Sequence, residues 1–299
     1  MHTLSRRNFI IQSSMIVAGA SSLLRPDETM PDPVVKTMHA SPEQLVDKAI
    51  EMLGGIETFV KPGQSVLIKP NIGWDRAPEQ AATTNPDIVS KIITLCRQAG
   101  AGKIRVLDRT CNSARRCYRR SGIADAAKQA GAQVRYTVTS RFRDTTIPEG
   151  RILKSWPIYK DVFDFDLLIN IPIAKTHSLS RVTLGMKNLM GLLGGDRGRL
   201  HEDFDEKIVD INSIIRPTLT IVDAYRVLLR NGPSGGSLDD VSLRETIIAG
   251  RDPVAVDAAA ALLFNIAPSS LPYLVNAERR GLGSMNLGAS KLKLFDFRG

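Results

Sequence analysis

The stretch DLLINIPIAKTHSLSRVTLGMKNLMGLLGGDRGRLH, residues 166–201, joins an apolar run to most of the unusual polar residues of the chain. Residues 167–173 are apolar at nearly every position, which is typical of a strand buried on both faces of a parallel sheet. Pro172 limits strand pairing, so we expect the strand to end near it. Lys175 and His177 would then lie just beyond its carboxyl end, where open α/β sheets bind their ligands.

Further polar residues follow in the same stretch, among several glycines. Lys187 and Asn188 come after the predicted strand, and His201 ends the segment. A single Lys or His after a strand is usually a solvated or capping residue. Gathering several cationic and imidazole side chains in a sheet crevice is costly without a ligand, so the group as a whole favours a functional site.

Strand and helix patterns alternate along the rest of the chain. Apolar runs at 66–68, 104–107 and 219–222 predict buried strands, and segments such as 41–53 and 84–99 predict helices. This alternation predicts an α/β fold, with a doubly wound, mostly parallel sheet and helices on both faces, in one domain or two lobes. At 299 residues with 43% hydrophobic content, the chain can bury such a core.

Polar residues stand at the ends of four predicted strands. Lys69 and Asn71 follow the predicted strand at 66–68, and Asp108 follows the one at 104–107. Lys175 and His177 follow the central strand, and Asp223 follows the strand at 219–222. Because the carboxyl ends of parallel strands meet at one edge of a sheet, we expect these side chains to converge on one crevice. Polar residues are common at strand ends, so chance agreement is the alternative.

The residue types in this crevice suit a small anionic molecule. Lysines can clamp a carboxylate or phosphate, and imidazole groups transfer protons near neutral pH. The candidates for catalysis are His177, His201 and Lys187. The candidates for ligand binding are Lys69, Asn71, Asn85, Lys175 and Asn188, of which Asn85 is also placed to cap a helix.

A divalent metal is a second candidate occupant, because imidazole and carboxylate groups suit such ions. Its expected ligands are His177, His201 and Asp223, with Asp108 or Glu202 as alternatives to Asp223. Their spacing matches no local metal motif, and no nucleotide-type phosphate loop is present. Asp257 lies on an apolar helix, where we expect an ion pair with one of the lysines. The carboxylates with a structural or metal-binding role are expected to be Asp108, Asp223, Asp252 and Asp257.

The N-terminus carries a separate signal. Ser5-Arg6-Arg7-Asn8-Phe9 precedes a modest apolar region with Ala18-Gly19-Ala20, an A-x-A-like cleavage site. The pattern predicts a twin-arginine (Tat) signal peptide over residues 1–25, a linker over 26–40 and an α/β domain over 41–299. We therefore expect the Tat export machinery as a partner and a periplasmic or other extracytoplasmic location.

Composition argues against some other functions. The formal charge is +9, but basic residues are spread along the chain, aromatic residues make up only 5% and no nucleic-acid motif is present, so nucleic acid is not an expected partner. The densest basic run, residues 115–120, is expected to be solvated surface. Three cysteines cannot supply a four-thiolate iron–sulfur cluster, and whether Cys111 pairs with Cys117 stays open.

Through these motifs, the chain resembles the DUF362 family, a group of α/β proteins of largely unknown activity. The similarity runs from about residue 66 to 264 through IKPN, TTNP, LINIPIAKTH, VTLGMKNLMG, IVDA, NGPSGG and DPVAVDA. By this resemblance, all the candidate site residues above occupy motif positions. Many members of that family carry a ferredoxin-like iron–sulfur module whose cysteines this chain lacks, so a redox role would need a partner or another cofactor.

Two functions follow as expectations. The first is an exported enzyme that binds an anionic small molecule at the strand carboxyl ends, with lysine clamps, histidine acid–base chemistry and a divalent metal as an option. The alternative is a non-catalytic or redox accessory protein that holds a cofactor or ligand in the same crevice. The oligomeric state is left open by the sequence.

Overall fold

Strands and helices alternate through residues 32–288 and 291–299, which are the residues that the computed structural model describes. The strands are β1 (Val34–Met38), β2 (Ser65–Pro70), β3 (Lys103–Val106), β4 (Gln133–Val134), β5 (Phe142–Thr146), β6 (Ser155–Tyr159), β7 (Leu167–Ile171), β8 (Ile173–His177), β9 (Arg181–Thr183), β10 (Leu219–Leu228), β11 (Val241–Gly250) and β12 (Leu292–Asp296). The α-helices are α1 (Pro42–Met52), α2 (Pro86–Gln98), α3 (Ala114–Arg120), α4 (Ile123–Gln129), α5 (Asp161–Asp164), α6 (Gly185–Asn188), α7 (Phe204–Ile214), α8 (Pro253–Ala261) and α9 (Pro272–Arg279).

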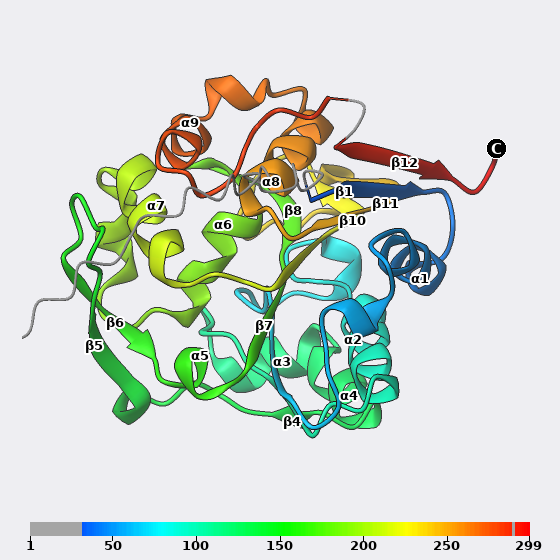
Figure 1. Cartoon of the computed structure of the whole chain (residues 1–299), viewed down its shortest axis with the longest axis horizontal. Coiled ribbons are helices and arrows are strands. Elements are labelled where there is room, and N and C mark those ends of the chain that lie inside the picture. The colour runs from blue at the N-terminus through cyan, green and yellow to red at the C-terminus, as the bar shows by residue number, and fades with distance from the viewer. Residues whose placement is uncertain (1–31, 289–290) are drawn as a thin grey trace, which may run out of the picture. The chain divides into compact units, whose positions relative to one another are not determined.

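Most strands of the main sheet run in the same direction (Figure 1). Its order is β12-β1-β11-β10-β7-β2-β3-β4, with β8 paired to β10 and β9 paired to β8. The neighbours from β10 to β4 pair in parallel, and β8 is parallel to β10. Within the described sheet, only β9 and β11 run against their neighbours. The expected α/β fold with a mostly parallel sheet is therefore confirmed.

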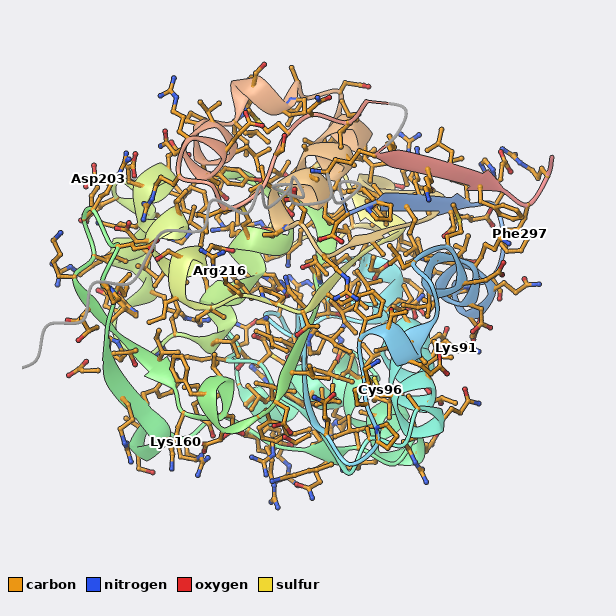
Figure 2. The ribbon with its side chains drawn as sticks, viewed as in Figure 1. Lys91, Cys96, Lys160, Asp203, Arg216 and Phe297 are labelled. Carbon is orange, nitrogen blue, oxygen red and sulfur yellow. The ribbon has the colours of Figure 1, made fainter. Side chains whose placement is uncertain are left out.

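Helices cover both faces of this sheet (Figure 1). One core cluster packs α1, α2 and α4 onto one face and includes Leu45, and the other packs α6, α7, α8 and α9 onto the opposite face and includes Leu274. Ile68 and Leu67 of β2 belong to the two different clusters, as the alternation of side chains along a strand requires. The side chain of Cys96 in α2, labelled in Figure 2, lies within the first cluster.

Side-chain capping explains where helices α1 and α2 begin. Ser41 caps α1 through a reciprocal capping box, in which Ser41 Oγ accepts from the Gln44 amide and Gln44 Oε1 accepts from the Ser41 amide. Asn85 caps α2, because its side-chain oxygen accepts a 3.0 Å hydrogen bond from the Asp87 amide. A proline follows each cap and fixes the first helical turn.

The central apolar run differs from the expectation in one respect. β7 ends at Ile171, just before Pro172, as expected, but strand pairing resumes directly after the proline. The Pro172 carbonyl accepts from the Asp223 amide at 2.8 Å, and the chain continues into β8. Lys175 and His177 therefore lie within a strand, where we expected a loop. The physical reason is that a proline removes one ladder donor but keeps its carbonyl acceptor, so a parallel neighbour can still pair beyond it.

The expected linker over residues 26–40 is wrong where the structure describes it. Val34–Met38 form β1, which pairs with β11 on one side and β12 on the other. Mixed polarity and flanking prolines hid this strand in the sequence. Asp32–Gly299 form one structural unit that includes it.

The expected signal peptide lies outside the described residues. Among the helices within them, none has the length and apolarity needed to cross a membrane. The arginine run at residues 115–120 falls on α3, and Arg115, Arg116, Arg119 and Arg120 are exposed, as expected of a solvated surface.

Candidate functional site

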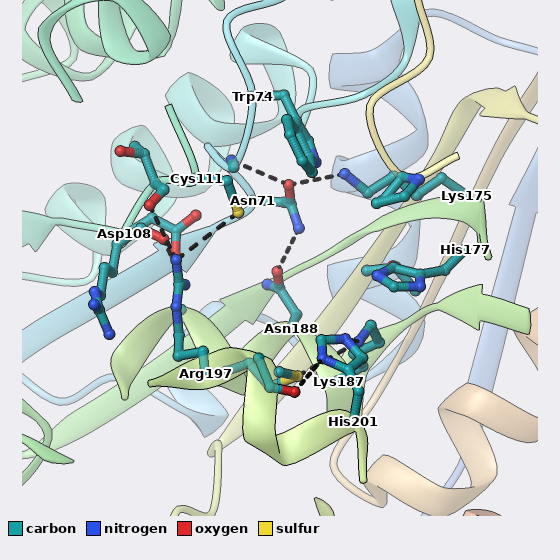
Figure 3. A pocket seen from close by; sticks show the side chains of 18 of the residues that line it. Asn71, Trp74, Asp108, Cys111, Lys175, His177, Lys187, Asn188, Arg197 and His201 are labelled. Atoms are coloured by element: carbon teal, nitrogen blue, oxygen red, sulfur yellow. Dashed lines mark hydrogen bonds between the residues drawn. The ribbon is translucent and has the colours of Figure 1, made fainter. Parts of the chain in front are cut away.

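A pocket of about 480 Å³ opens at the carboxyl ends of β2 and β3, beside β8 and α6 (Figure 3). It brings together residues from segments that are far apart in the sequence, as the parallel arrangement of strands predicts. The candidate residues that line it are Lys69, Asn71, Asp108, Lys175, His177, Lys187, Asn188 and His201.

Lys69 and Asp108 form a buried ion pair at the base of the pocket. Lys69 Nζ lies 2.7 Å from Asp108 Oδ1, and the two side chains are 1% and 3% exposed. Asp108 Oδ2 also accepts from the Ile72 amide, and the Asp108 amide donates to the Tyr118 hydroxyl. Burial lowers the pKa of Lys69, although the carboxylate opposes this shift. Its charge is therefore largely neutralised within the protein.

Gly191 is required by the close approach of this pair. A Cβ atom at Gly191 would lie 1.8 Å from Asp108 Oδ1 and 2.7 Å from Lys69 Nζ. The Gly191 carbonyl meanwhile accepts from the Arg109 amide at 2.9 Å. The glycine thus lets the backbone that follows α6 pack directly against the ion pair.

Asn188 organises a network of amide side chains on the neighbouring wall. Its Oδ1 accepts from Asn71 Nδ2 at 2.9 Å and from Lys69 Nζ at 3.1 Å, while its Nδ2 donates to Asn170 Oδ1 at 2.8 Å. Figure 3 shows Asn71 between Asn188 and Lys175. Because every member has a partner, the network fixes the orientation of these side chains.

Lys175 is a buried cation without a carboxylate partner among the described residues. It is 1% exposed, and its Nζ donates to the Ala82 carbonyl at 2.6 Å and to Asn71 Oδ1 at 3.2 Å. Burial lowers its pKa to about 7. Two neutral acceptors fix the position of the amino group but leave its charge uncompensated, which favours an anion in the pocket.

Lys187 is the second buried lysine of this kind. It is 6% exposed, and its Nζ lies 2.9 Å from His201 Nε2 and 4.7 Å from the ring centroid of Phe204. Burial lowers the pKa of Lys187 to about 7. His201 Nδ1 lies 3.2 Å from the Gly198 carbonyl, so Nδ1 carries the proton of the neutral ring and Nε2 accepts from the lysine.

His177 has the opposite tautomer. Its Nδ1 accepts from the Leu179 and Ser180 amides, so the neutral ring carries its proton on Nε2. The rings of His177 and His201 stack with their centroids 5.3 Å apart. Burial, followed by the charge of Lys187, lowers the pKa of His177 to about 3. His177 is therefore a neutral hydrogen-bond donor at neutral pH.

Several pocket residues were missed by the sequence reasoning. Thr183 Oγ1 is buried without a hydrogen-bond partner among the described residues. Arg197 donates to the Arg109 and Thr110 carbonyls and lies 3.8 Å from Cys111 Sγ (Figure 3). Thr183 ends the short strand β9 and Arg197 begins a single 3-10 turn, and elements this short carry no clear periodic signal. The cysteines of the described chain are free, so Cys111 and Cys117 are not joined.

Asn85 and Asp223 were expected in this crevice but do not line it. Asp223 lies inside β10 rather than at its end, is 1% exposed, and accepts from the amides of Asn85 and Tyr225. Burial raises the pKa of Asp223 to about 6. Asn85 caps α2, as described above. Both residues thus hold the backbone that supports the pocket.

Asp252 and Asp257 also have structural contacts. Asp252 caps α8 and forms a 2.7 Å ion pair with Lys291. The ion pair expected for Asp257 with a pocket lysine is wrong, because its oxygens accept from the Gly185 and Met186 amides and from the Tyr273 hydroxyl. Backbone donors satisfy this carboxylate in place of a cation, and burial raises its pKa to about 7.

The expected metal ligands do not form a set. The rings of His177 and His201 stack, but the carboxylate of Asp223 accepts hydrogen bonds from backbone amides at the start of α2 and in β10. Residues 32–288 and 291–299 contain no group of three or more His, Cys, Asp or Glu side chains placed to hold a metal ion. The residues that are present suit an anion better, since lysines and arginines outnumber carboxylates in the pocket lining.

The fold and the pocket together define a class: an α/β protein with a cation-lined pocket at the carboxyl ends of its parallel strands. A family model described as a domain of unknown function, DUF362, matches residues 66–262, and the chain belongs to this family.

The chain is also 28% identical over 241 residues to the thylakoid-associated protein sll1697 of Synechocystis sp., covering 78% of this chain and 73% of that protein. A solved structure, the lactate racemase apoprotein from Thermoanaerobacterium thermosaccharolyticum, is 12% identical with a TM-score of 0.46. That match covers 74% of this chain and only 55% of the racemase chain.

Proposed function

We propose that this protein is an enzyme that binds a small carboxylate- or phosphate-bearing molecule in the pocket and moves a proton on it. The observation that carries the proposal is the burial of Lys175 and Lys187 without a carboxylate partner among the described residues. A bound anion would compensate both charges. The unpartnered hydroxyl of Thr183 in the same lining adds a further donor.

The histidines supply the proton-transfer groups of the proposal. His177 offers Nε2–H to a ligand oxygen, and His201 Nε2 can take a proton from Lys187. General acid–base chemistry needs such groups within hydrogen-bond reach of the reacting atoms and with a pKa near the working pH. Lys187, whose pKa burial lowers to about 7, satisfies the second condition.

Calorimetric titration of the full chain with pyruvate, inorganic phosphate and uncharged acetone tests the binding claim. We expect heat from at least one anion and none from acetone. Lys175→Gln should weaken that anion's binding roughly 10- to 100-fold, because a buried charge-assisted contact is lost. The matched control is Lys293→Gln, an exposed lysine on β12 outside the pocket, which should bind as the unmodified protein does. Absence of binding by both anions would contradict the proposal.

We also propose that the protein is exported through the twin-arginine pathway. The support is the Ser5-Arg6-Arg7-Asn8-Phe9 pattern with the apolar region behind it. Replacing Arg6 and Arg7 together by lysine should retain the protein in the cytoplasm, as measured by fractionation of cells that carry the pathway. Unchanged export of the double variant would contradict this assignment.

A further inference from the structure

Lys187 differs from the other two pocket lysines in the group that accepts its hydrogen bond. Lys69 faces the carboxylate of Asp108, and Lys175 donates to a backbone carbonyl and to an amide oxygen. The ion pair favours a charged ammonium, and amide oxygens do not take up a proton near neutral pH. Lys187 Nζ instead lies 2.9 Å from an imidazole nitrogen, His201 Nε2, which can accept a proton.

His201 is held in the orientation that this transfer needs. The contact between its Nδ1 and the Gly198 carbonyl leaves the lone pair on Nε2, facing Lys187. The remaining neighbours of Lys187 Nζ are Met190 Sδ at 3.5 Å and the Phe204 ring, and no described carboxylate pairs with it. Because burial lowers the pKa of Lys187 to about 7, a substantial share of the amine is neutral at physiological pH.

We propose that Lys187 is a nucleophile that forms an imine with the carbonyl group of a small oxo acid. An amine, an adjacent base and a group that orients the base form the arrangement by which proteins activate weak nucleophiles. The substrate class follows from the two buried lysines: Lys175 would bind the acid group while Lys187 Nζ attacks the carbonyl carbon. This inference rests on the proposed function, since it needs an anion in the same pocket.

The reaction balances without an oxidant or a reductant. The lone pair of Lys187 Nζ forms the C–N bond as the carbonyl π pair moves to oxygen. His201 Nε2 takes one proton from the nitrogen and passes it to the oxygen, which gives a carbinolamine. In the second step the nitrogen lone pair forms the C=N bond as the C–O bond breaks, and His201 Nε2 passes the second nitrogen proton to the departing hydroxyl group, which leaves as water. The products are one imine and one water.

Reductive trapping followed by peptide mass spectrometry tests this step. The full chain is incubated with pyruvate and sodium borohydride, whose hydride converts the imine to a stable secondary amine. We expect one adduct, located on Lys187. Lys187→Arg keeps a positive charge but removes the nucleophile, so the adduct should disappear. His201→Asn should slow adduct formation at least about tenfold, as loss of a general base does. Lys293→Arg, the matched control, should leave the adduct unchanged.

Pyruvate binding measured by calorimetry in the same preparations separates the two proposals. Pyruvate bound without any adduct on Lys187 in the unmodified protein would overturn the imine and leave the anion-binding function standing. Adduct spread over exposed lysines with no preference for Lys187 would also overturn it. No binding of pyruvate or phosphate would overturn both. Because the adduct is mapped in the unmodified protein, the decision does not depend on whether a variant folds.

Discussion

Buried positive charge is the main feature of the pocket at the scale of single residues. Lys69 has a carboxylate at 2.7 Å, whereas Lys175 and Lys187 have only neutral acceptors within the part of the chain that the structure describes. An uncompensated buried charge costs free energy, and proteins retain it where a ligand supplies the counter-charge. The titration of these two amino groups should therefore control binding.

Anion binding should weaken as pH rises. Burial lowers the pKa of Lys175 and of Lys187 to about 7, so both lose their charge as pH passes through that value in the free protein. A bound anion favours the charged forms, so affinity should fall by up to about tenfold per pH unit for each lysine that must be charged. Titration of acetate, a carboxylate that keeps its charge from about pH 6 to 9 and has no carbonyl group for Lys187 to attack, measures this. Affinity that stays constant or rises would contradict the assignment.

Gly191→Ala should disrupt the base of the pocket. The added Cβ would overlap Asp108 Oδ1 and crowd Lys69 Nζ, so either the ion pair or the backbone must move. We expect destabilisation on the order of 2 kcal/mol and at least about tenfold weaker anion binding. Chemical denaturation and calorimetry measure the two effects. Gly281→Ala, an open position with positive φ that lies outside the pocket, should cost stability but leave affinity unchanged.

Residue types at strand ends were predictable, but their partners were not. A charged residue at the carboxyl end of a buried strand is visible in the sequence, as Lys69 and Asp108 show. That Tyr118 on α3 bonds the backbone of Asp108 depends on where a distant helix packs. Asp257 shows the same limit. A carboxylate on an apolar helix needs partners, but the sequence did not distinguish a lysine from backbone amides.

At the scale of elements, α6 is placed by a contact with α8. Asp257 of α8 accepts hydrogen bonds from the first two amides of α6, and Gly185 has no Cβ that would collide with this carboxylate. α6 carries Lys187 and Asn188, so the connection fixes two pocket side chains at once.

Asp257→Ala should therefore release α6 from its position. Two buried amides and the Tyr273 hydroxyl lose their acceptor, which should cost on the order of 3 kcal/mol of stability. Asp257→Asn retains one carbonyl acceptor and should cost less. Denaturation of both variants, together with calorimetric titration of the folded protein, gives the comparison. Equal stability of Asp257→Ala and the unmodified protein would show that α6 does not depend on this contact.

The elements were predicted better than their ends. β10 continues from Leu219 to Leu228, so Asp223 falls in mid-strand, although the apolar run had suggested an end just before it. The amide of Asp223 donates to the Pro172 carbonyl and thereby links β10 to the junction of β7 and β8. Such pairing depends on neighbouring strands, which an apolar pattern in one segment does not reveal.

At the scale of the whole molecule, the parallel sheet explains why distant segments share one pocket. Strands β2 and β3 end side by side, so Lys69, Asn71 and Asp108 converge once the strand order is set. The alternation of strands and helices in the sequence predicts this convergence. The sequence did not predict that Asp223 is excluded or that β1 joins the sheet through β11 and β12, because both depend on long-range pairing.

A crystal structure of the full chain grown with pyruvate or phosphate would test the central claim most directly. We predict that phosphate lies within hydrogen-bond distance of Lys175 Nζ and Lys187 Nζ, and that pyruvate has its carboxylate at Lys175 Nζ and its carbonyl carbon at Lys187 Nζ. A saturating concentration of either anion that leaves this pocket empty while the anion occupies another surface would contradict the account.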